Sequence, residues 1–363
     1  MRLQAILALG LALALPAASA VSRDAPASAP AMFDTLFNPT LAETRAAILI
    51  VDGRVVARRY APGYSDANRF ISWSMAKTVT AMLIGELVAD GRLKLDAPAP
   101  IAEWRRPGDP RGAITLRHLL NMASGLRHVE VGEPIEASDT NQVLFVGGTQ
   151  DMAARAIAAP LADPPGKRFR YSSLTSIILA EIITRTLTDS RDPRVRAKAY
   201  RDFAEQRLFA PAAMRRVFLE FDGAGTQVGG SILHMPLDDW ARFGRLLLDG
   251  RGADGRQVIA PEWLAFMKSP SPADPIYGGQ TWRNVSGGEE TLFPGKGPPG
   301  TVSAIGHLGQ YVVAASAPVA PGGPTRTMIL VRLGKTQDDQ LPPLRARLGD
   351  ITAAVFAHQG PLP

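Results

Sequence analysis

The sequence contains no cysteine, and this absence excludes several kinds of protein. Thiol nucleophiles, zinc sites with cysteine ligands and iron–sulfur clusters cannot form without it. Disulfide bonds are also excluded, so the hydrophobic core must hold the fold together. Hydrophobic residues make up 46% of the 363 positions, which is ordinary for a globular protein with a sizeable core. A chain of this length allows one large domain or two smaller ones.

Long apolar runs are also scarce, and the only pronounced one lies at the start, over residues 3–15. Met1-Arg2 precedes this run, Pro16 ends it, and Ala18-Ser19-Ala20 follows as a typical cleavage site. The run is too short to cross a bilayer, so residues 1–20 are predicted to be a secretory signal peptide rather than an uncleaved membrane anchor. We therefore expect an exported protein, periplasmic or secreted, with no membrane span after cleavage.

Metal, cofactor and nucleic-acid motifs are missing as well. The five histidines show no His-Glu-x-x-His or similar ligand spacing, and no glycine-rich phosphate loop precedes a predicted helix. The net charge of +6 comes mostly from arginine, for example in residues 54–60 and 191–201. These clusters lack interleaved aromatic residues, so they are interpreted as a solvated basic surface. We expect no metal, no cofactor and no nucleic-acid partner.

The pattern along the chain predicts strands first and a helix next. Two β-rich runs within residues 46–60 are joined at Asp52-Gly53, a strong hairpin signal. Residues 75–91 then carry apolar side chains at helical spacing and end at Gly91.

From Ile114 to about Arg216 the pattern is mostly helical, interrupted by glycine and proline loops. A helix over 240–250, strands over 301–316 and 327–334 and a helix over 342–357 follow. This order predicts an α+β protein whose antiparallel sheet is built from both ends of the chain, with a mostly helical region inserted between them.

One Ser-x-x-Lys, formed by Ser74 and Lys77, lies at the start of the predicted helix over 75–91. A serine hydroxyl is a poor nucleophile and needs a neighbouring base, which a lysine provides only when its pKa is lowered. Lys77 lies one turn after Ser74 among apolar residues, so it can be buried. The alternative is that Ser74 caps the helix and Lys77 lies on the surface.

Two further segments carry candidate site residues. Tyr171 directly precedes an apolar helix, where its hydroxyl can pass a proton to a leaving group. In residues 306–316, His307 and Gly309 are expected on a strand edge that a substrate approaches, because Gly309 has no side chain in the way. Alone, Tyr171 and His307 are equally compatible with structural roles.

Taken together, these signals resemble one family. Ser74-Met75-Ala76-Lys77, Tyr171-Ser172-Ser173 and His307-Leu308-Gly309 are similar to the S-x-x-K, Y-x-N/S and K/H-x-G elements of the penicillin-recognising serine hydrolases. The similarity covers most of residues 40–335 and is greatest to the 6-aminohexanoate-dimer hydrolase and esterase branch. It implies a β-lactamase/transpeptidase-like fold, with residues 21–363 as one catalytic domain. The sheet region would cover about 40–105 and 217–363, and the helical region about 106–216.

The resemblance also implies roles for residues. Ser74 would be the acylated nucleophile, Lys77 its base and Tyr171 the proton shuttle. The backbone N–H groups of Ser74 and Gln310 would form the oxyanion hole. The resemblance also places Ser173 and His307 in the substrate cleft. The residues themselves suggest that Gly309 and Trp282 line this cleft and that the loop from Glu130 to Gly148 shapes specificity.

The implied activity is hydrolysis of an amide or ester bond in a small molecule or short peptide through an acyl-enzyme. Two departures argue against efficient penicillin hydrolysis, because His307 replaces a lysine and Ser173 replaces an asparagine of the related β-lactamases. A D-alanyl carboxypeptidase, a weak β-lactamase and a non-catalytic sensor module remain alternatives. Gly229-Gly230-Ser231 is not a second nucleophile motif, because Leu233 breaks the Gly-x-Ser-x-Gly pattern. It is interpreted as a tight turn near the cleft.

Overall fold

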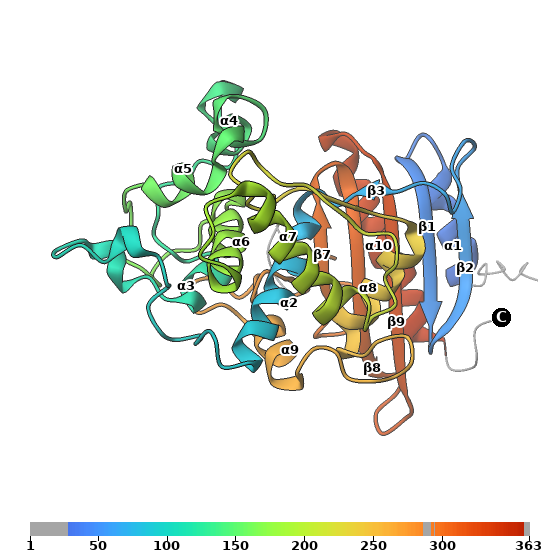
Figure 1. Ribbon diagram of the computed structural model, residues 1–363. Coiled ribbons are helices and arrows are strands. Elements are labelled where there is room, and N and C mark those ends of the chain that lie inside the picture. The colour runs from blue at the N-terminus through green and yellow to red at the C-terminus, as the bar shows by residue number, and fades with distance from the viewer. Residues whose placement is uncertain (1–27, 286–291, 294, 359–363) are drawn as a thin grey trace, which may run out of the picture.

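The computed structural model describes residues 28–285, 292–293 and 295–358, so the predicted signal peptide lies outside the described part of the chain. A six-stranded antiparallel sheet has the order β2-β1-β9-β8-β7-β6 (Figure 1). Its strands are β1 (Glu43–Val51), β2 (Arg54–Tyr60), β6 (Trp282–Arg283), β7 (Val302–Gly306), β8 (Gln310–Pro318) and β9 (Thr325–Lys335). Because β1 pairs with β9, the sheet joins both ends of the chain as the sequence predicts.

The hairpin predicted at Asp52-Gly53 is confirmed. Both residues have positive φ angles, 49° and 77°, which is the geometry of a two-residue turn that matches the twist of the strands it joins. Along β1, buried apolar side chains alternate between the two faces of the sheet, with Ala47 and Leu49 on one and Ala46 and Ile48 on the other. Each face therefore has its own hydrophobic core.

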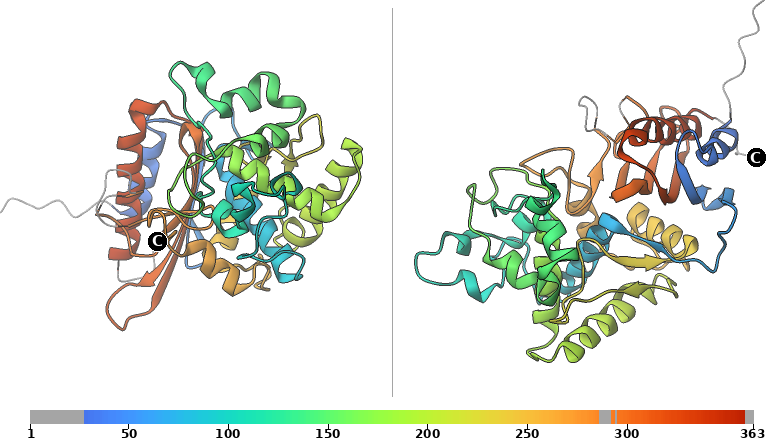
Figure 2. Two further views of the ribbon diagram at one scale, coloured as in Figure 1. Left: turned by 90° about the vertical axis from the view of Figure 1, so that its left-hand side faces the viewer. Right: turned by 90° about the horizontal axis from the view of Figure 1, so that it is seen from above.

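Helices cover both faces of the sheet (Figure 2). The N-terminal α1 (Ala29–Asp34) and the C-terminal α10 (Leu341–Ala357) pack together on one face. On the other face, α8 (Leu237–Asp249) lies against β8 and β9. The prediction of a final helix is confirmed, and Gly250, with φ of 74°, ends α8 as the sequence predicts.

The mostly helical region lies on the side of α2 (Ala76–Ala89) that faces away from the six-stranded sheet (Figure 1). Its helices are α3 (Leu116–Leu120), α4 (Asp139–Phe145), α5 (Met152–Ala158), α6 (Ser173–Leu187) and α7 (Pro193–Ala204). Within this region, α6 packs against α2. Three short strands, β3 (Phe70–Ile71), β4 (Phe218–Leu219) and β5 (Leu233–Met235), form a second sheet, and α9 (Pro261–Lys268) follows α8. The sequence pattern predicted neither this small sheet nor α9, because such short elements carry too few residues to show a period.

One local prediction is wrong. Residues 307–309 do not continue a strand but form the tight turn between β7 and β8, with φ of 58° at Leu308 and 77° at Gly309. The residues on both sides have high strand propensity, so the sequence pattern did not indicate the turn. Gly309 makes this turn possible because glycine adopts left-handed backbone easily. Within the described part of the chain, no helix is long and apolar enough to cross a membrane.

Candidate active site

Ser74 lies in a short helical turn, residues 73–75, immediately before α2. The preceding Trp73 has a φ of 43°, a left-handed backbone that is rare for a non-glycine residue. Ser72 fixes the approach to this turn, because its N–H donates to the Leu233 carbonyl at 2.8 Å and its hydroxyl accepts from the Leu233 N–H at 3.0 Å. The half-buried Ser74 thus stands at the junction of the small sheet and α2.

Lys77 lies one turn further along α2 and is only 1% exposed. Its Nζ lies 2.9 Å from Ser74 Oγ, 2.8 Å from Ser173 Oγ and 2.6 Å from the Gly230 carbonyl oxygen. Burial lowers the pKa of Lys77 from its usual 10.5 to about 8, and the negative charge of Glu130 opposes that shift. A lysine with this pKa is neutral in about one tenth of the molecules at pH 7, far more than a lysine with the usual pKa.

Tyr171 directly precedes α6, whose first turn is capped by the Ser172 side chain. Its ring lies 4.8 Å from Lys77 Nζ and packs against Trp282 with ring centroids 5.3 Å apart. Burial is the main cause that raises the pKa of Tyr171 well above its usual value, while interactions with Ser74 and Trp282 oppose the rise. The phenol therefore stays protonated and close to both Ser74 and Lys77.

The buried Ser173 joins Lys77 to an acidic residue that the sequence did not single out as a site residue. Its hydroxyl donates to Glu130 Oε1 at 2.7 Å, and its backbone N–H donates to Glu130 Oε2 at 2.6 Å. Glu130 lies 43 residues earlier, in the loop before α4. No local sequence pattern marks such a long-range contact.

The turn at residues 307–309 approaches Ser74 from the sheet. A Cβ atom on Gly306 would lie 2.2 Å from the Ser72 carbonyl oxygen, so the end of β7 directly abuts the segment before Ser74. The exposed His307 stacks its ring edge-on against Trp73, with centroids 5.4 Å apart. His307, Trp73 and Ser74 thus lie together at one edge of the site.

Gly309 does not have the role that its sequence context predicted. A Cβ atom there would meet Arg332 Nη1 at 2.8 Å and Leu344 Cδ2 at 3.0 Å, so the missing side chain makes room for the protein interior rather than for a substrate. The buried Arg332 donates to the Gly309 carbonyl at 2.8 Å and supports the turn from behind.

Gln310 begins β8 and pairs with Gly306 across the turn. Its side chain is buried, with Nε2 donating to the Gly334 carbonyl at 2.6 Å and to the His307 carbonyl at 3.1 Å. Gln310 therefore fixes the shape of the turn that abuts the segment before Ser74.

The interpretation of Gly229-Gly230-Ser231 as a tight turn is confirmed, since the Ser231 N–H donates to the Val228 carbonyl at 3.0 Å, and the turn lies beside Lys77. A Cβ atom on Gly230 would lie 2.4 Å from the Ser173 carbonyl oxygen, and one on Gly229 would lie 2.8 Å from Ala180 Cβ. Only glycine allows this segment to pass close enough to α6 for its carbonyl to reach Lys77.

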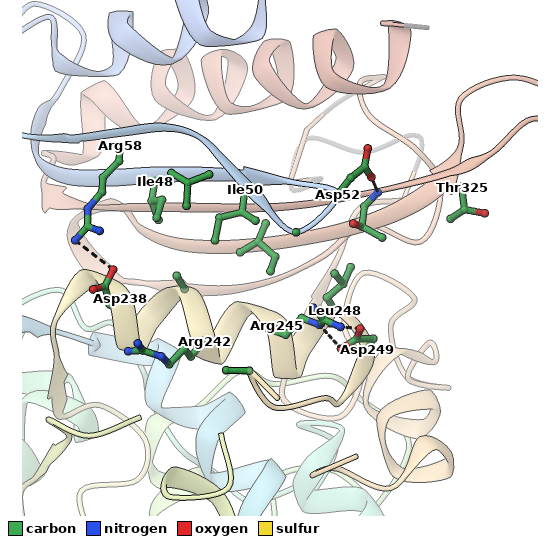
Figure 3. Close-up of a pocket in the computed structure, with 16 residues that line it drawn as sticks. Ile48, Ile50, Asp52, Arg58, Asp238, Arg242, Arg245, Leu248, Asp249 and Thr325 are labelled. Carbon is green, nitrogen blue, oxygen red and sulfur yellow. Dashed lines mark hydrogen bonds and ion pairs between the residues drawn. The ribbon is translucent and has the colours of Figure 1, made fainter. Parts of the chain in front are cut away.

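A separate groove lies away from these residues, between α8 and the sheet (Figure 3). Its volume is about 650 Å³ and its floor includes Ile48 and Ile50. Four of its charged side chains pair with one another, Arg58 with Asp238 at 3.2 Å and Arg245 with Asp249 at 2.8 Å. None of the predicted catalytic residues lines it. In the described ranges of the chain, no three histidine or acidic side chains gather in a way that could hold a metal ion.

The fold and the Ser–Lys–Tyr cluster define a class of protein. The Beta-lactamase family model matches residues 33–348, and the chain belongs to this family.

Within it, the chain is 23% identical over 230 residues to a 6-aminohexanoate-dimer hydrolase from Paenarthrobacter ureafaciens, covering 61% of this chain and 56% of that protein. It is 31% identical over 189 residues to the esterase EstB from Burkholderia gladioli, covering 45% and 47%. The chain thus spans about half the length of the curated relatives it matches.

Solved structures show the same fold. A Bacillus anthracis protein assigned as a 6-aminohexanoate-dimer hydrolase aligns with a TM-score of 0.67 at 21% identity, over 88% of this chain and 81% of that one. A penicillin-binding protein homologue from Caulobacter crescentus aligns with a TM-score of 0.58 at 18% identity, over 88% and 96%. The predicted α+β fold of the β-lactamase/transpeptidase type is confirmed.

Proposed function

We propose that the protein is a serine hydrolase that cleaves an amide or ester bond through a covalent acyl-Ser74 intermediate. The observation that carries this proposal is the 2.9 Å contact between Ser74 Oγ and the buried Lys77 Nζ. A serine hydroxyl reacts at useful rates only when an adjacent base accepts its proton, and burial supplies the lowered lysine pKa that this requires.

In the first half of the reaction, neutral Lys77 takes the Ser74 hydroxyl proton while Oγ attacks the carbonyl carbon. The tetrahedral intermediate then collapses, and the bond to the leaving nitrogen or oxygen breaks. Tyr171 donates its phenolic proton to the leaving group and regains one from the Lys77 ammonium. The protonated state favoured by burial suits Tyr171 to this donation. In the second half, water attacks the acyl carbon by the reverse proton transfers, which releases the acid and frees Ser74.

The oxyanion would be held by the backbone N–H of Ser74 and by a second N–H from the turn between β7 and β8. Gln310 is the donor implied by the family resemblance, and the backbone N–H of His307, next to Gly306, is a second candidate on this turn. The close approach of Gly306 to Ser72 supports a donor in this position. Each such preorganised donor contributes about 3–4 kcal/mol to transition-state stabilisation.

The substrate would be a small molecule or short peptide with an amide or ester bond. Trp282, Ser173 and His307 would line the cleft, and the loop from Glu130 to Gly148 would shape one wall of it. That loop exposes several apolar side chains, including Val131 and Phe145, toward which an apolar acyl or leaving group could extend. The relatives named 6-aminohexanoate-dimer hydrolase and esterase support both bond types. We propose that the protein acts after export, in the periplasm or outside the cell.

A fluorophosphonate probe tests this proposal directly. Intact-protein mass spectrometry should show one adduct on the wild type, peptide mapping should locate it at Ser74, and Ser74→Ala should remain unlabelled. Equal labelling of Ser74→Ala would refute the assignment. Turnover of p-nitrophenyl esters, short amides and 6-aminohexanoate oligomers, with nitrocefin as the β-lactam comparison, would then identify the bond that is cleaved.

A further inference from the structure

Glu130 is an acidic side chain beside the catalytic cluster that has no part in the mechanism above. It lies in the loop that precedes α4, and this loop is held at several points. The Glu130 carbonyl accepts from Ser138 Oγ at 2.7 Å, and the carbonyl of the neighbouring Val129 accepts from the Asp139 N–H at 2.8 Å. A Cβ atom on Gly132 would lie only 2.3 Å from Ser138 N, so the loop folds tightly back on itself. The carboxylate therefore has a fixed position.

Three donors converge on this carboxylate. Oε1 accepts from the Ser173 hydroxyl, while Oε2 accepts from the Ser173 N–H and from Thr140 Oγ1, each at 2.6 Å. An ionised carboxylate can only accept, so the single hydroxyl proton of Ser173 points toward Glu130. Ser173 Oγ must then act as the acceptor in its 2.8 Å contact with Lys77 Nζ.

This direction determines where the lone pair of neutral Lys77 lies. A neutral amine has two N–H bonds and one lone pair. The Gly230 carbonyl, at 2.6 Å, can only accept, and Ser173 Oγ is restricted to accepting by Glu130. Both N–H bonds are thereby used, and the lone pair is left facing Ser74 Oγ at 2.9 Å. This is the arrangement in which Lys77 accepts the nucleophile's proton.

We propose that Glu130 is a positioning residue that acts through Ser173, directing the lone pair of Lys77 at Ser74 and setting the pH at which this base becomes neutral. The inference rests on the proposed acyl-Ser74 function. The groups that interact with this carboxylate electrostatically come from four segments: Lys77 of α2, Tyr171 before α6, Tyr277 before β6, and His128 of the same loop. Lys77 is the one among them that our mechanism requires as a base. A nearby negative charge favours the ammonium form of Lys77, so Glu130 raises the pH at which Lys77 becomes a neutral base.

The test compares the pH dependence of fluorophosphonate labelling in the wild type, Glu130→Gln and Glu262→Gln. Glu262 lies exposed in the first turn of α9, outside the loop that would line the cleft, so its replacement removes one negative charge without touching Ser173. We expect the labelling midpoint of Glu130→Gln to move down by about one pH unit, because Lys77 loses a nearby negative charge. Its plateau rate should fall about tenfold, because the amide no longer fixes the Ser173 proton. Glu262→Gln should match the wild type.

Ser173→Ala separates the two parts of this role. It keeps the charge of Glu130 but removes the linking hydroxyl, so its labelling should slow at every pH while the midpoint stays near that of the wild type. If Glu130→Gln does not fold, Ser173→Ala still tests whether the link through Ser173 affects the labelling rate. An unchanged midpoint in folded Glu130→Gln, or an unchanged rate in Ser173→Ala, would overturn the inference.

A readout without catalysis distinguishes failure of this inference from failure of the proposed function. The melting temperatures of the wild type and Lys77→Met are measured as a function of pH. The part of the rise with pH that is absent in Lys77→Met reports the titration of Lys77 itself. In Glu130→Gln this rise should begin at a lower pH than in the wild type, whether or not Ser74 reacts with any probe. The same onset in both proteins would overturn the proposed role of Glu130. Absence of labelling at Ser74 in the wild type would instead count against the acyl-enzyme.

Discussion

The Nζ of Lys77 and the carbonyl oxygen of Gly230 lie 2.6 Å apart, although 153 residues separate them in the sequence. This contact fixes one N–H direction of the buried lysine and so helps to aim the rest of the amine at Ser74. It exists because Gly230 has no side chain to hold its backbone away from α6. The proposed catalytic geometry therefore depends on a glycine whose side chain takes no part in the reaction.

Replacing Gly230 tests this dependence. In Gly230→Ala the new Cβ would lie 2.4 Å from the Ser173 carbonyl oxygen, which is backbone and cannot move aside cheaply. We expect a loss of about 1–3 kcal/mol in the free energy of unfolding, together with reduced kcat/KM as the carbonyl moves away from Lys77. Urea unfolding and ester turnover measure the two effects. Gly147→Ala is the matched control for the unfolding measurement, because its Cβ would meet nothing within 4 Å. Equal losses of stability in both variants would contradict the prediction.

The pH dependence of activity should follow Lys77. Acylation requires the neutral amine, so kcat/KM for an uncharged ester should rise about tenfold per pH unit at low pH and level off above a midpoint near 8. Stopped-flow or steady-state rates measured over about five pH units, from roughly pH 5 to pH 10, would show this profile. A single midpoint near the pKa of an ordinary carboxyl group would exclude Lys77 as the base.

The same titration has a consequence for stability. The pKa of Lys77 is about 8 in the folded protein, below its usual 10.5, so between these values the unfolded chain binds more protons than the folded one. The contribution of Lys77 to folding should therefore become more favourable as pH rises through this window. Subtracting the melting profile of Lys77→Met from that of the wild type isolates this contribution. A difference that falls with pH in this range would have the wrong sign.

Tyr171→Phe should separate proton transfer from packing. The ring would keep its place against Trp282 and Tyr277, at centroid distances of 5.3 and 5.9 Å, so the melting temperature should remain close to that of the wild type. The loss of the hydroxyl should reduce amide hydrolysis by about 10²–10⁴-fold. A p-nitrophenyl ester should be affected less, because nitrophenolate leaves without being protonated. Equal losses for both substrates would argue against Tyr171 as the donor to the leaving group.

Parts of the fold and the site could be predicted because their signals are local. The hairpin at Asp52-Gly53, the helix after Ser74 and the apolar helix after Tyr171 are each encoded in a few consecutive residues. The turn at His307–Gly309 was mistaken for a strand edge because left-handed backbone at Leu308 has no signature in the side chain. Gly309 was correctly noticed, but the space it leaves is filled by Arg332 rather than open to a ligand.

The sequence by itself determined which reactive groups are present and how the main elements alternate, since these follow from residue type and from periods of a few residues. Only the tertiary structure brought Ser173, Gly230 and Glu130 around Lys77, at separations of 96 and 153 residues for the first two contacts. Hydrogen-bond direction, burial and the resulting pKa of Lys77 depend on these distant partners. A lysine three residues after a serine can act as its base only when two conditions are met. The rest of the chain must exclude water from the amine, and its other hydrogen bonds must direct the lone pair at the serine hydroxyl.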